Sequence, residues 1–240
     1  MNSDIVKVIK VIRFENDRFY EIQEKVINEI VFKIFINNQN VQNIITINDD
    51  LEYLCYGSLF LGTDLDINSI LNNIKIYDDR CDIVYNKLDY NLNCCCESKK
   101  GFHRKSLIEN IDIGHVIPDD IFKMHTIFYD RSEIFKQTAG IHGAGIFDQD
   151  CNLLYFAKDI ARHNCISKIC GFLIKNSDNI AKTKYIFLSC RINSEILKMI
   201  SKIGISYILT KSSVSYQAIK ECKNVRLIGF IRENRFTIFS

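Results

Sequence analysis

Three adjacent cysteines are the most unusual chemical feature of the sequence. The stretch NLNCCCESKKG contains Cys94, Cys95 and Cys96, followed by Glu97 and two lysines. A thiol becomes a nucleophile when it loses its proton, and neighbouring cations favour that loss. Adjacent cysteines do not easily reach the geometry of a relaxed disulfide with one another. The trio therefore predicts a reactive thiol site on a basic loop, and the alternative is a surface loop without a function.

A zinc site at these cysteines is a weaker interpretation. Two thiolates hold one zinc ion comfortably when they are separated as in C-x-x-C, and this spacing is absent from the trio. Cys94 and Cys96 would have to chelate the ion in a strained way, with Cys81 or His103 completing the ligand set. We therefore expect no metal site.

Polar residues in two segments of the second half of the chain could bind an anion. His142 lies among three glycines in TAGIHGAGIF, and Arg162, His163 and Asn164 are consecutive in KDIARHNCISKICG. Glycine allows the backbone to approach a ligand closely, and arginine or histidine at a helix start suits a phosphate-bearing ligand. The alternative interpretations are a plain glycine-rich turn and a solvated helix face.

Two further segments carry arginine near the ends of expected strands. Ser189 and Arg191 lie in LSCRINSE, directly after a strand-like apolar run, and Asn193 and Ser194 can cap the helix that follows. The last segment, GFIRENRF, contains Phe230, Ile231, Arg232, Glu233, Asn234 and Arg235. Because the guanidinium fork matches phosphate geometry, a nucleotide diphosphate is a plausible ligand. Two exposed arginines on a hairpin are the alternative.

The composition is that of a globular protein in a reducing compartment. The chain has 240 residues, 47% hydrophobic and 25% charged, with a net charge of +2, so neither nucleic acid nor a membrane is an expected partner. No apolar run approaches the ~20 residues that span a bilayer, and the N-terminus lacks a signal-peptide core. We expect a cytoplasmic protein whose seven other cysteines pack as small apolar groups.

The second half of the chain has the pattern of an α/β sheet. Apolar runs at 184–189, 205–209 and 225–231 alternate with segments whose apolar residues recur every three or four positions. This order predicts parallel strands joined by helices, closed by a hairpin strand in RENRFTIFS. In the first half, the sequence predicts a strand at 30–37 that ends in an Asn-Asn turn, a helix from residue 51, and a helix beginning at Pro118.

Common catalytic templates are absent. The sequence contains no G-x-x-x-x-G-K-[ST] loop and no G-x-S-x-G elbow, which argues against a P-loop nucleotidase and an α/β-hydrolase. It also lacks the H-x-E and P-C-x-x-C pair of the zinc deaminases.

Taken in order, these segments resemble the formate dehydrogenase accessory protein family of sulfur carriers. The matching stretches are LEYLCYGSLFLGTDL, FKQTAGIHGAGIFD, KDIARHNCISKICG, LSCRINSEILK, SSVSYQAI and LIGFIRENRFTIFS. The third and most specific stretch matches at Asp159, Arg162, His163, Asn164, Lys168 and Gly171. The sequence departs from the family where CCCESKKG replaces Cys-Gly-x-Cys-Gly, and where Ala139, Ala161 and Cys190 replace glycine.

The resemblance implies a three-layer, cytidine-deaminase-like α/β domain without its zinc site. We place this domain at 128–240, after a smaller β-rich α+β domain at 1–93 and a cysteine-bearing loop and linker helix at 94–127. The implied activity is that of a sulfurtransferase. One of Cys94, Cys95 and Cys96 accepts persulfide sulfur from a cysteine desulfurase and delivers it to Mo-bis(molybdopterin guanine dinucleotide), bound as cargo, for formate dehydrogenase.

The resemblance also implies which residues contact this cofactor, and that the protein forms a homodimer. The expected contacts are His142, Arg162, His163, Asn164, Ser189, Arg191, Phe230, Ile231, Arg232, Glu233, Asn234 and Arg235. The alternative function is a chaperone that binds the molybdenum cofactor or a guanine nucleotide and has lost sulfur transfer.

Overall fold

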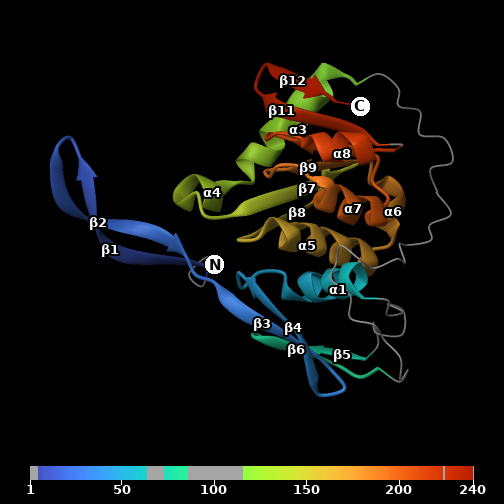
Figure 1. Cartoon of the computed structure of the whole chain (residues 1–240), viewed down its shortest axis with the longest axis horizontal. Coiled ribbons are helices and arrows are strands. Elements are labelled where there is room, and N and C mark those ends of the chain that lie inside the picture. Colours follow the sequence, from blue (N-terminus) through green and yellow to red (C-terminus); the bar gives the residue numbers. More distant parts are fainter. Residues whose placement is uncertain (1–4, 64–72, 86–115, 224, 240) are drawn as a thin grey trace.

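The computed structural model describes residues 5–63, 73–85, 116–223 and 225–239 (Figure 1). Within these residues the strands form three sheets, of two, four and six strands. The six-stranded sheet and its helices make a large domain, the four-stranded sheet and one helix make a small domain, and the two-stranded sheet projects from both as an arm (Figure 1). None of the helices in these ranges is long and apolar enough to cross a membrane.

The large domain is built on a mixed sheet with the order β12-β11-β10-β9-β7-β8. Its strands are β7 (His142–Phe147), β8 (Leu153–Asp159), β9 (Tyr185–Leu188), β10 (Tyr207–Thr210), β11 (Arg226–Arg232) and β12 (Arg235–Ile238). The three predicted parallel strands are confirmed as β9, β10 and β11, and the predicted closing strand is β12, antiparallel to β11. The sequence did not predict the β7–β8 hairpin, which pairs antiparallel with β9.

Helices cover both faces of this sheet, which gives three layers and confirms the predicted α/β class (Figure 1). Side chains of β9 alternate, so Tyr185 and Phe187 pack on one face and Ile186 and Leu188 on the other. The first face is covered by α3 (Pro118–Asp130), and the second by α5 (Arg162–Lys175), α7 (Ser194–Ile203) and α8 (Tyr216–Glu221). Two short helices, α4 (Glu133–Thr138) and α6 (Asp178–Lys182), complete the domain.

Two of these helices begin where the sequence indicated. Pro118 occupies the first turn of α3. The Asn193 side chain accepts a hydrogen bond from the Ile196 N–H and caps α7. The helix α3 packs against the large sheet from residue 121 onward. It runs without a break across position 127/128, where the sequence analysis places the boundary between the linker and the C-terminal domain.

The small domain packs one helix on a sheet with the order β4-β3-β6-β5. Its elements are β3 (Ile30–Ile36), β4 (Gln39–Thr46), α1 (Leu51–Gly62), β5 (Ile74–Ile76) and β6 (Arg80–Ile83). Phe32, Ile34 and Ile36 alternate along β3 toward α1 and are fully buried. The predicted Asn-Asn turn is confirmed, since Asn37 and Asn38 both have positive φ, as a tight hairpin requires.

The two domains meet where α1 crosses α5, and glycines allow this crossing. A Cβ atom on Gly57 would lie 1.7 Å from the Ser167 carbonyl oxygen, and one on Gly171 would lie 1.9 Å from the Tyr53 carbonyl oxygen. The helices therefore touch backbone to backbone. Beside this crossing, Tyr155 of the large domain stacks on Phe172 and donates a hydrogen bond to the Asp50 carboxylate.

The arm is a long antiparallel hairpin of β1 (Val6–Glu15) and β2 (Arg18–Ile27). Its two-residue turn, Asn16 and Asp17, has positive φ at both positions. The root of the arm is held by a small apolar cluster of Ile5, Ile47, Ile134 and Ile141, with Val6, Ile27, Phe135 and Ile160 packed against it. The sequence did not predict the arm, because charged residues interrupt its strands.

Ala139 has a left-handed backbone conformation, with φ 50°, at the end of α4. An L-residue with a Cβ is strained in this region by about 1–2 kcal/mol, whereas glycine is not. We expect Ala139→Gly to raise the free energy of unfolding by about 0.5–1 kcal/mol in urea titrations.

Ala161→Gly is the matched control, because φ is −107° there and alanine is unstrained. This variant should lower the free energy of unfolding by a similar amount, through the greater freedom of the unfolded chain. An Ala139→Gly protein no more stable than Ala161→Gly would show that the strain is absent.

Candidate functional site

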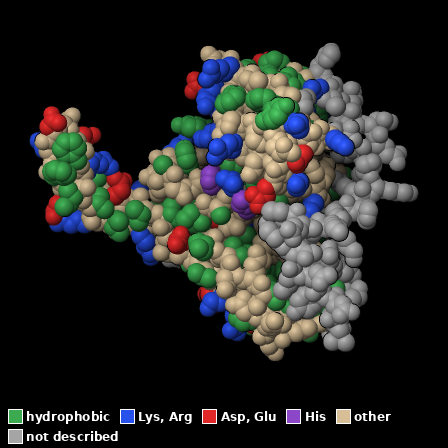
Figure 2. All heavy atoms as spheres, in the orientation of Figure 1, with side chains coloured by type: hydrophobic (Ala, Val, Ile, Leu, Met, Phe, Trp, Pro, Cys, Tyr) green, Lys and Arg blue, Asp and Glu red, His purple; other side chains and the backbone are tan. Residues whose placement is uncertain are grey.

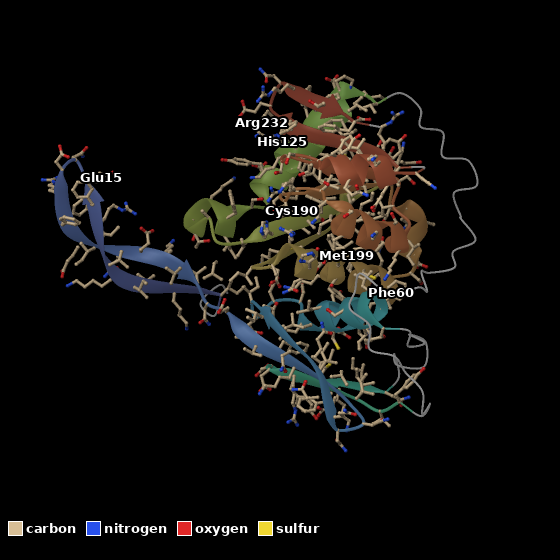
Figure 3. The ribbon with its side chains drawn as sticks, in the orientation of Figure 1. Glu15, Phe60, His125, Cys190, Met199 and Arg232 are labelled. Carbon is tan, nitrogen blue, oxygen red and sulfur yellow. The ribbon has the colours of Figure 1, made fainter. Side chains whose placement is uncertain are left out.

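A cavity of about 890 Å³ lies at the carboxyl-terminal edge of the parallel strands. Ser189 directly follows β9, Lys211 directly follows β10, and Arg232 ends β11. In α/β sheets this edge is where ligands collect. The cavity is lined by His125, Thr126, Tyr129, Ser189, Lys211, Ser212, Ile231, Arg232, Glu233 and Asn234. Figure 3 shows His125 of α3 and Arg232 of β11 at this edge, above Cys190.

Two basic side chains on neighbouring strand ends give the cavity its cationic character. The Lys211 ammonium lies 4.4 Å from the centroid of the Phe135 ring, and burial, followed by the charge of Arg232, lowers the pKa of Lys211. Arg232 Nη1 donates hydrogen bonds to the carbonyl oxygens of Lys211 and Ile231, which fix its guanidinium on the cavity wall. Such a pair suits a phosphorylated ligand.

Two histidines near the cavity are held in the neutral form. Burial, followed by the charge of Lys211, lowers the pKa of His125 below 6.5. Burial, followed by the charge of Arg162, lowers the pKa of His142 in the same direction. His142 Nδ1 lies 3.2 Å from Ser189 Oγ, which also accepts a hydrogen bond from the Gly143 N–H. At neutral pH both imidazoles can therefore accept or donate hydrogen bonds without adding charge.

A second basic group lies at the start of α5, just beyond the end of β8. Arg162 is the first residue of this helix, and Ala161 provides no side-chain cap. Arg162 Nε is buried and has no hydrogen-bond partner among the residues that the structure describes. His163 Nε2 lies 2.9 Å from the Glu195 carboxylate of α7. This group adjoins His142, because the charge of Arg162 contributes to the lowered pKa of that imidazole, and His142 in turn contacts Ser189.

Asn164 lies in a buried network between the two domains. Its side-chain amide donates to the Ile45 carbonyl oxygen and to the Asp159 carboxylate, at 2.8 and 2.9 Å. Asp159 also accepts a hydrogen bond from Thr46 and forms an ion pair with Lys168. These contacts give Asn164 a structural role, and its contact with the cofactor stays a prediction.

Three other residues that we predicted to bind the cofactor are outside the cavity lining. Arg191 is exposed after β9, and Arg235 is exposed at the start of β12. Phe230 has an unusual φ of 54° and is 42% exposed, with its ring 6.0 Å from that of Phe239. Their cofactor contacts stay predictions.

Sequence reasoning missed half of the cavity lining. The missed residues are His125, Thr126, Tyr129, Lys211 and Ser212. Lys211 and Ser212 directly follow a predicted strand, the same signal that led to Ser189, so this rule could have found them. No sequence signal places α3 over the cavity, because that position depends on packing across the sheet.

Cys94, Cys95 and Cys96 lie outside the described residues, so their role stays a prediction. The seven described cysteines form no disulfide with one another, and the predicted packing role is confirmed for six of them: Cys55, Cys81, Cys151, Cys165, Cys170 and Cys190 are buried. Burial raises the pKa of both Cys151 and Cys190 to about 11, so neither is a thiolate at neutral pH. Within the described ranges, no three His, Cys, Asp or Glu side chains are placed to hold a metal ion.

Comparison with known proteins identifies the family. The model of the FdhD/NarQ family matches residues 27–240. The chain belongs to this family. Sulfur carrier protein FdhD of Listeria monocytogenes is 30% identical over 256 residues, which cover 99% of this chain and 97% of that protein. Sulfur carrier protein FdhD of Staphylococcus haemolyticus is 28% identical over 258 residues, which cover 100% of this chain and 97% of that protein.

The fold of this FdhD/NarQ member is shared with a solved structure. A crystal structure assigned as a formate dehydrogenase accessory protein from Desulfotalea psychrophila matches with a TM-score of 0.77 and 20% identity, over 98% of this chain and 97% of that one. The family resemblance inferred from the motifs is therefore confirmed. In this FdhD/NarQ member, the motif KDIARHNCISKICG has two roles. Asp159 and Lys168 form the buried ion pair at the junction between the domains, and Arg162 is the basic residue that begins α5 beside the cavity.

Proposed function

We propose that this FdhD/NarQ member is a sulfur carrier that accepts persulfide sulfur from a cysteine desulfurase and transfers it to Mo-bis(molybdopterin guanine dinucleotide) for formate dehydrogenase. The observation that carries the proposal is similarity along nearly the whole chain to proteins named sulfur carriers. The cation-lined cavity at the sheet edge supports it, because the cofactor carries phosphates.

The cavity offers complementary groups for each part of a guanine nucleotide. Lys211 and Arg232 are placed to neutralise phosphate charge. Glu233 provides a carboxylate acceptor of the kind that the N–H groups of a guanine base require. The neutral His125 can hydrogen-bond a sugar or phosphate oxygen without adding charge. The proposed cargo is therefore held through its nucleotide end.

Sulfur transfer itself is assigned to the cysteine trio. A thiolate of Cys94, Cys95 or Cys96 attacks the terminal sulfur of the persulfide on the donor. The sulfur–sulfur bond of the donor breaks, the donor cysteine leaves as a thiolate, and the carrier becomes a persulfide. One sulfur atom moves and no net oxidation occurs. On delivery, the sulfur–sulfur bond of the carrier persulfide breaks, the carrier cysteine leaves as a thiolate, and the cofactor, as the acceptor, supplies the electron pair for its new bond to the sulfur.

Mass spectrometry of the intact protein tests the carrier role. After incubation with a cysteine desulfurase and free cysteine, we expect the protein to gain about 32 Da, one sulfur atom, on the peptide that contains the trio. The variant with Cys94, Cys95 and Cys96 all changed to alanine should gain no mass. Cys222→Ala, which changes a partly exposed thiol elsewhere, is the matched control and should still be loaded.

A second candidate function would remain if loading fails. The trio lacks the Cys-x-x-Cys spacing of the family, whereas the basic residues Lys211 and Arg232 line the cavity. A protein that binds the guanine nucleotide but never gains sulfur would be a cofactor chaperone rather than a carrier. Under either function we propose a cytoplasmic protein that acts as a homodimer and meets formate dehydrogenase.

A further inference from the structure

Two cysteine thiols of the small domain are in direct contact. Cys55 lies on α1 and Cys81 on β6, and their Sγ atoms are 2.7 Å apart. Both side chains are fully buried, so neither belongs to the molecular surface drawn in Figure 2. The two form no disulfide with one another in the structure. Packing as small apolar groups accounts for their burial, but it does not require one sulfur to face another.

The local structure directs both thiols to the same place in the core. Along α1, Leu51, Cys55 and Leu59 recur every four residues and share the face that packs on the small sheet (Figure 1). On β6, Cys81 is the direct cross-strand partner of Ile34 on β3, which is fully buried in the same cluster. Directly paired residues project from the same face of a sheet. The contact therefore joins the helix to an inner strand across the core.

The small domain has few other means of holding its helix on its sheet. It contains one helix and four strands, and two of those strands have only three and four residues. Its apolar residues form a single cluster. A core of this size supplies little stability by itself, and small domains commonly add a covalent link such as a disulfide. A bond between α1 and β6 would provide such a link.

We propose that Cys55 and Cys81 are a site of oxidative modification, at which hydrogen peroxide converts the two thiols into a disulfide that joins α1 to β6. This inference goes beyond the proposed function, because it concerns neither the cysteine trio nor the cavity. The sulfur atoms of a disulfide are about 2.05 Å apart. The two Sγ atoms therefore need to approach each other by less than about 1 Å.

The oxidation proceeds in two balanced steps. The thiolate of one cysteine attacks a peroxide oxygen, the oxygen–oxygen bond breaks, and hydroxide leaves, which gives a sulfenic acid. The thiolate of the other cysteine then attacks the sulfenic sulfur. The sulfur–sulfur bond forms, and the hydroxyl group takes up a proton and leaves as water. In sum, two thiols lose two electrons and two protons to one peroxide, which becomes two water molecules.

Burial determines when this reaction can occur. Burial, followed by the contact with Cys81, raises the pKa of Cys55 well above its usual value. The Cys55 thiol is therefore protonated in the folded protein at neutral pH, and the first step requires local opening of the small domain. Once one sulfur is oxidised and the domain closes, the other thiol is in contact with it. Closure therefore favours the disulfide over further oxidation of the first sulfur.

Peptide mapping of the full-length protein tests the site. After treatment with hydrogen peroxide, the remaining thiols are alkylated under denaturing conditions and the protein is digested. We expect the peptide that contains Cys55 to be linked to the peptide that contains Cys81, with the loss of two hydrogen atoms, about 2 Da. Dithiothreitol should separate them. Cys55→Ala and Cys81→Ala should each abolish the link. Cys170→Ala, which removes a buried thiol of the large domain, is the matched control and should keep it.

Urea titration measures the consequence of the bond. The disulfide would connect residues 26 positions apart, so it should raise the urea midpoint of the oxidised protein by about 1 M relative to the reduced protein. Oxidised and reduced Cys55→Ala should have the same midpoint. Because each protein is compared with its own reduced form, any stability that the substitution itself removes does not affect the result.

Three results would overturn the proposal. The first is the absence of the linked peptide after the exposed thiols of the protein have been oxidised. The second is a Cys55 peptide that carries sulfinic acid in place of the link. The third is an oxidised wild type whose urea midpoint is no higher than that of the reduced protein. Sulfur loading of the trio is measured on a different peptide, so its outcome is distinguishable from all three.

Discussion

Replacing Lys168 with methionine is expected to lower the free energy of unfolding by about 3–5 kcal/mol, the cost of leaving a buried charge without its partner. Lys168 and Asp159 are both fully buried, and Lys168 Nζ lies 2.8 Å from the Asp159 carboxylate. Lys168 also donates a hydrogen bond to the Lys158 carbonyl oxygen. Methionine has a similar length and no charge, so it isolates the loss of the ion pair.

Urea titration of two further variants distinguishes the buried Lys168–Asp159 pair from a solvent-exposed ion pair. Asp159→Asn combined with Lys168→Met should recover part of the loss, because no unpaired charge remains buried. Lys198→Met is the matched control: Lys198 is 55% exposed and lies 3.7 Å from Glu221, so its loss should cost at most about 0.5 kcal/mol. A cost below about 1 kcal/mol for Lys168→Met would contradict the role given to the pair.

The position of this pair matters for the site as well as for stability. Asp159 ends β8 and accepts hydrogen bonds from the Ala161 N–H of the large domain and from Thr46 of the small domain. Arg162 and His163 follow directly at the start of α5. The buried network therefore fixes both the junction of the domains and the basic residues beside the cavity.

Gly171→Ala is expected to lower the free energy of unfolding by about 3 kcal/mol, the upper part of the range for overpacked sites. The added Cβ would lie 1.9 Å from the Tyr53 carbonyl oxygen of α1. Because the obstacle is backbone, no rotation of a side chain can relieve the clash, and α1 must move away from α5. That movement would separate the two domains.

The predicted loss of stability is opposite in direction to the effect of the same substitution in an unobstructed helix. In an unobstructed helix interior, alanine is more stable than glycine by about 0.5–1 kcal/mol. Gly57→Ala should behave like Gly171→Ala, because its Cβ would lie 1.7 Å from the Ser167 carbonyl oxygen. Urea titration of either variant that showed increased stability would contradict the backbone contact between α1 and α5.

Local patterns in the sequence were sufficient for much of the large domain. The apolar runs of β9, β10 and β11 and the helices between them follow from periodicity. The Asn193 cap and the Pro118 helix start follow from residue chemistry that acts within one turn. Ser189 and Arg232, which the sequence places near the ends of predicted strands, both line the cavity.

Features that depend on distant contacts could not be predicted in this way. The role of Asn164 depends on the Ile45 carbonyl oxygen, 119 positions earlier in the chain. The position of His125 depends on α3 packing across the sheet. The strands of the arm carry charges on both faces, because the body covers only their root, so they lack the alternation that marks a half-buried strand.

The central claim is that the cavity at the edge of β9, β10 and β11 holds the nucleotide end of the cofactor, and titration calorimetry with GDP tests it most directly. We expect one GDP to bind per chain, and Lys211→Met to weaken binding at least about tenfold, since a charge-assisted hydrogen bond contributes roughly 1.5–3 kcal/mol. Lys182→Met, an exposed change on α6 before the opposite edge of the sheet, should leave the affinity unchanged. The absence of GDP binding to the wild type, or equal affinities for wild type and Lys211→Met, would contradict the claim.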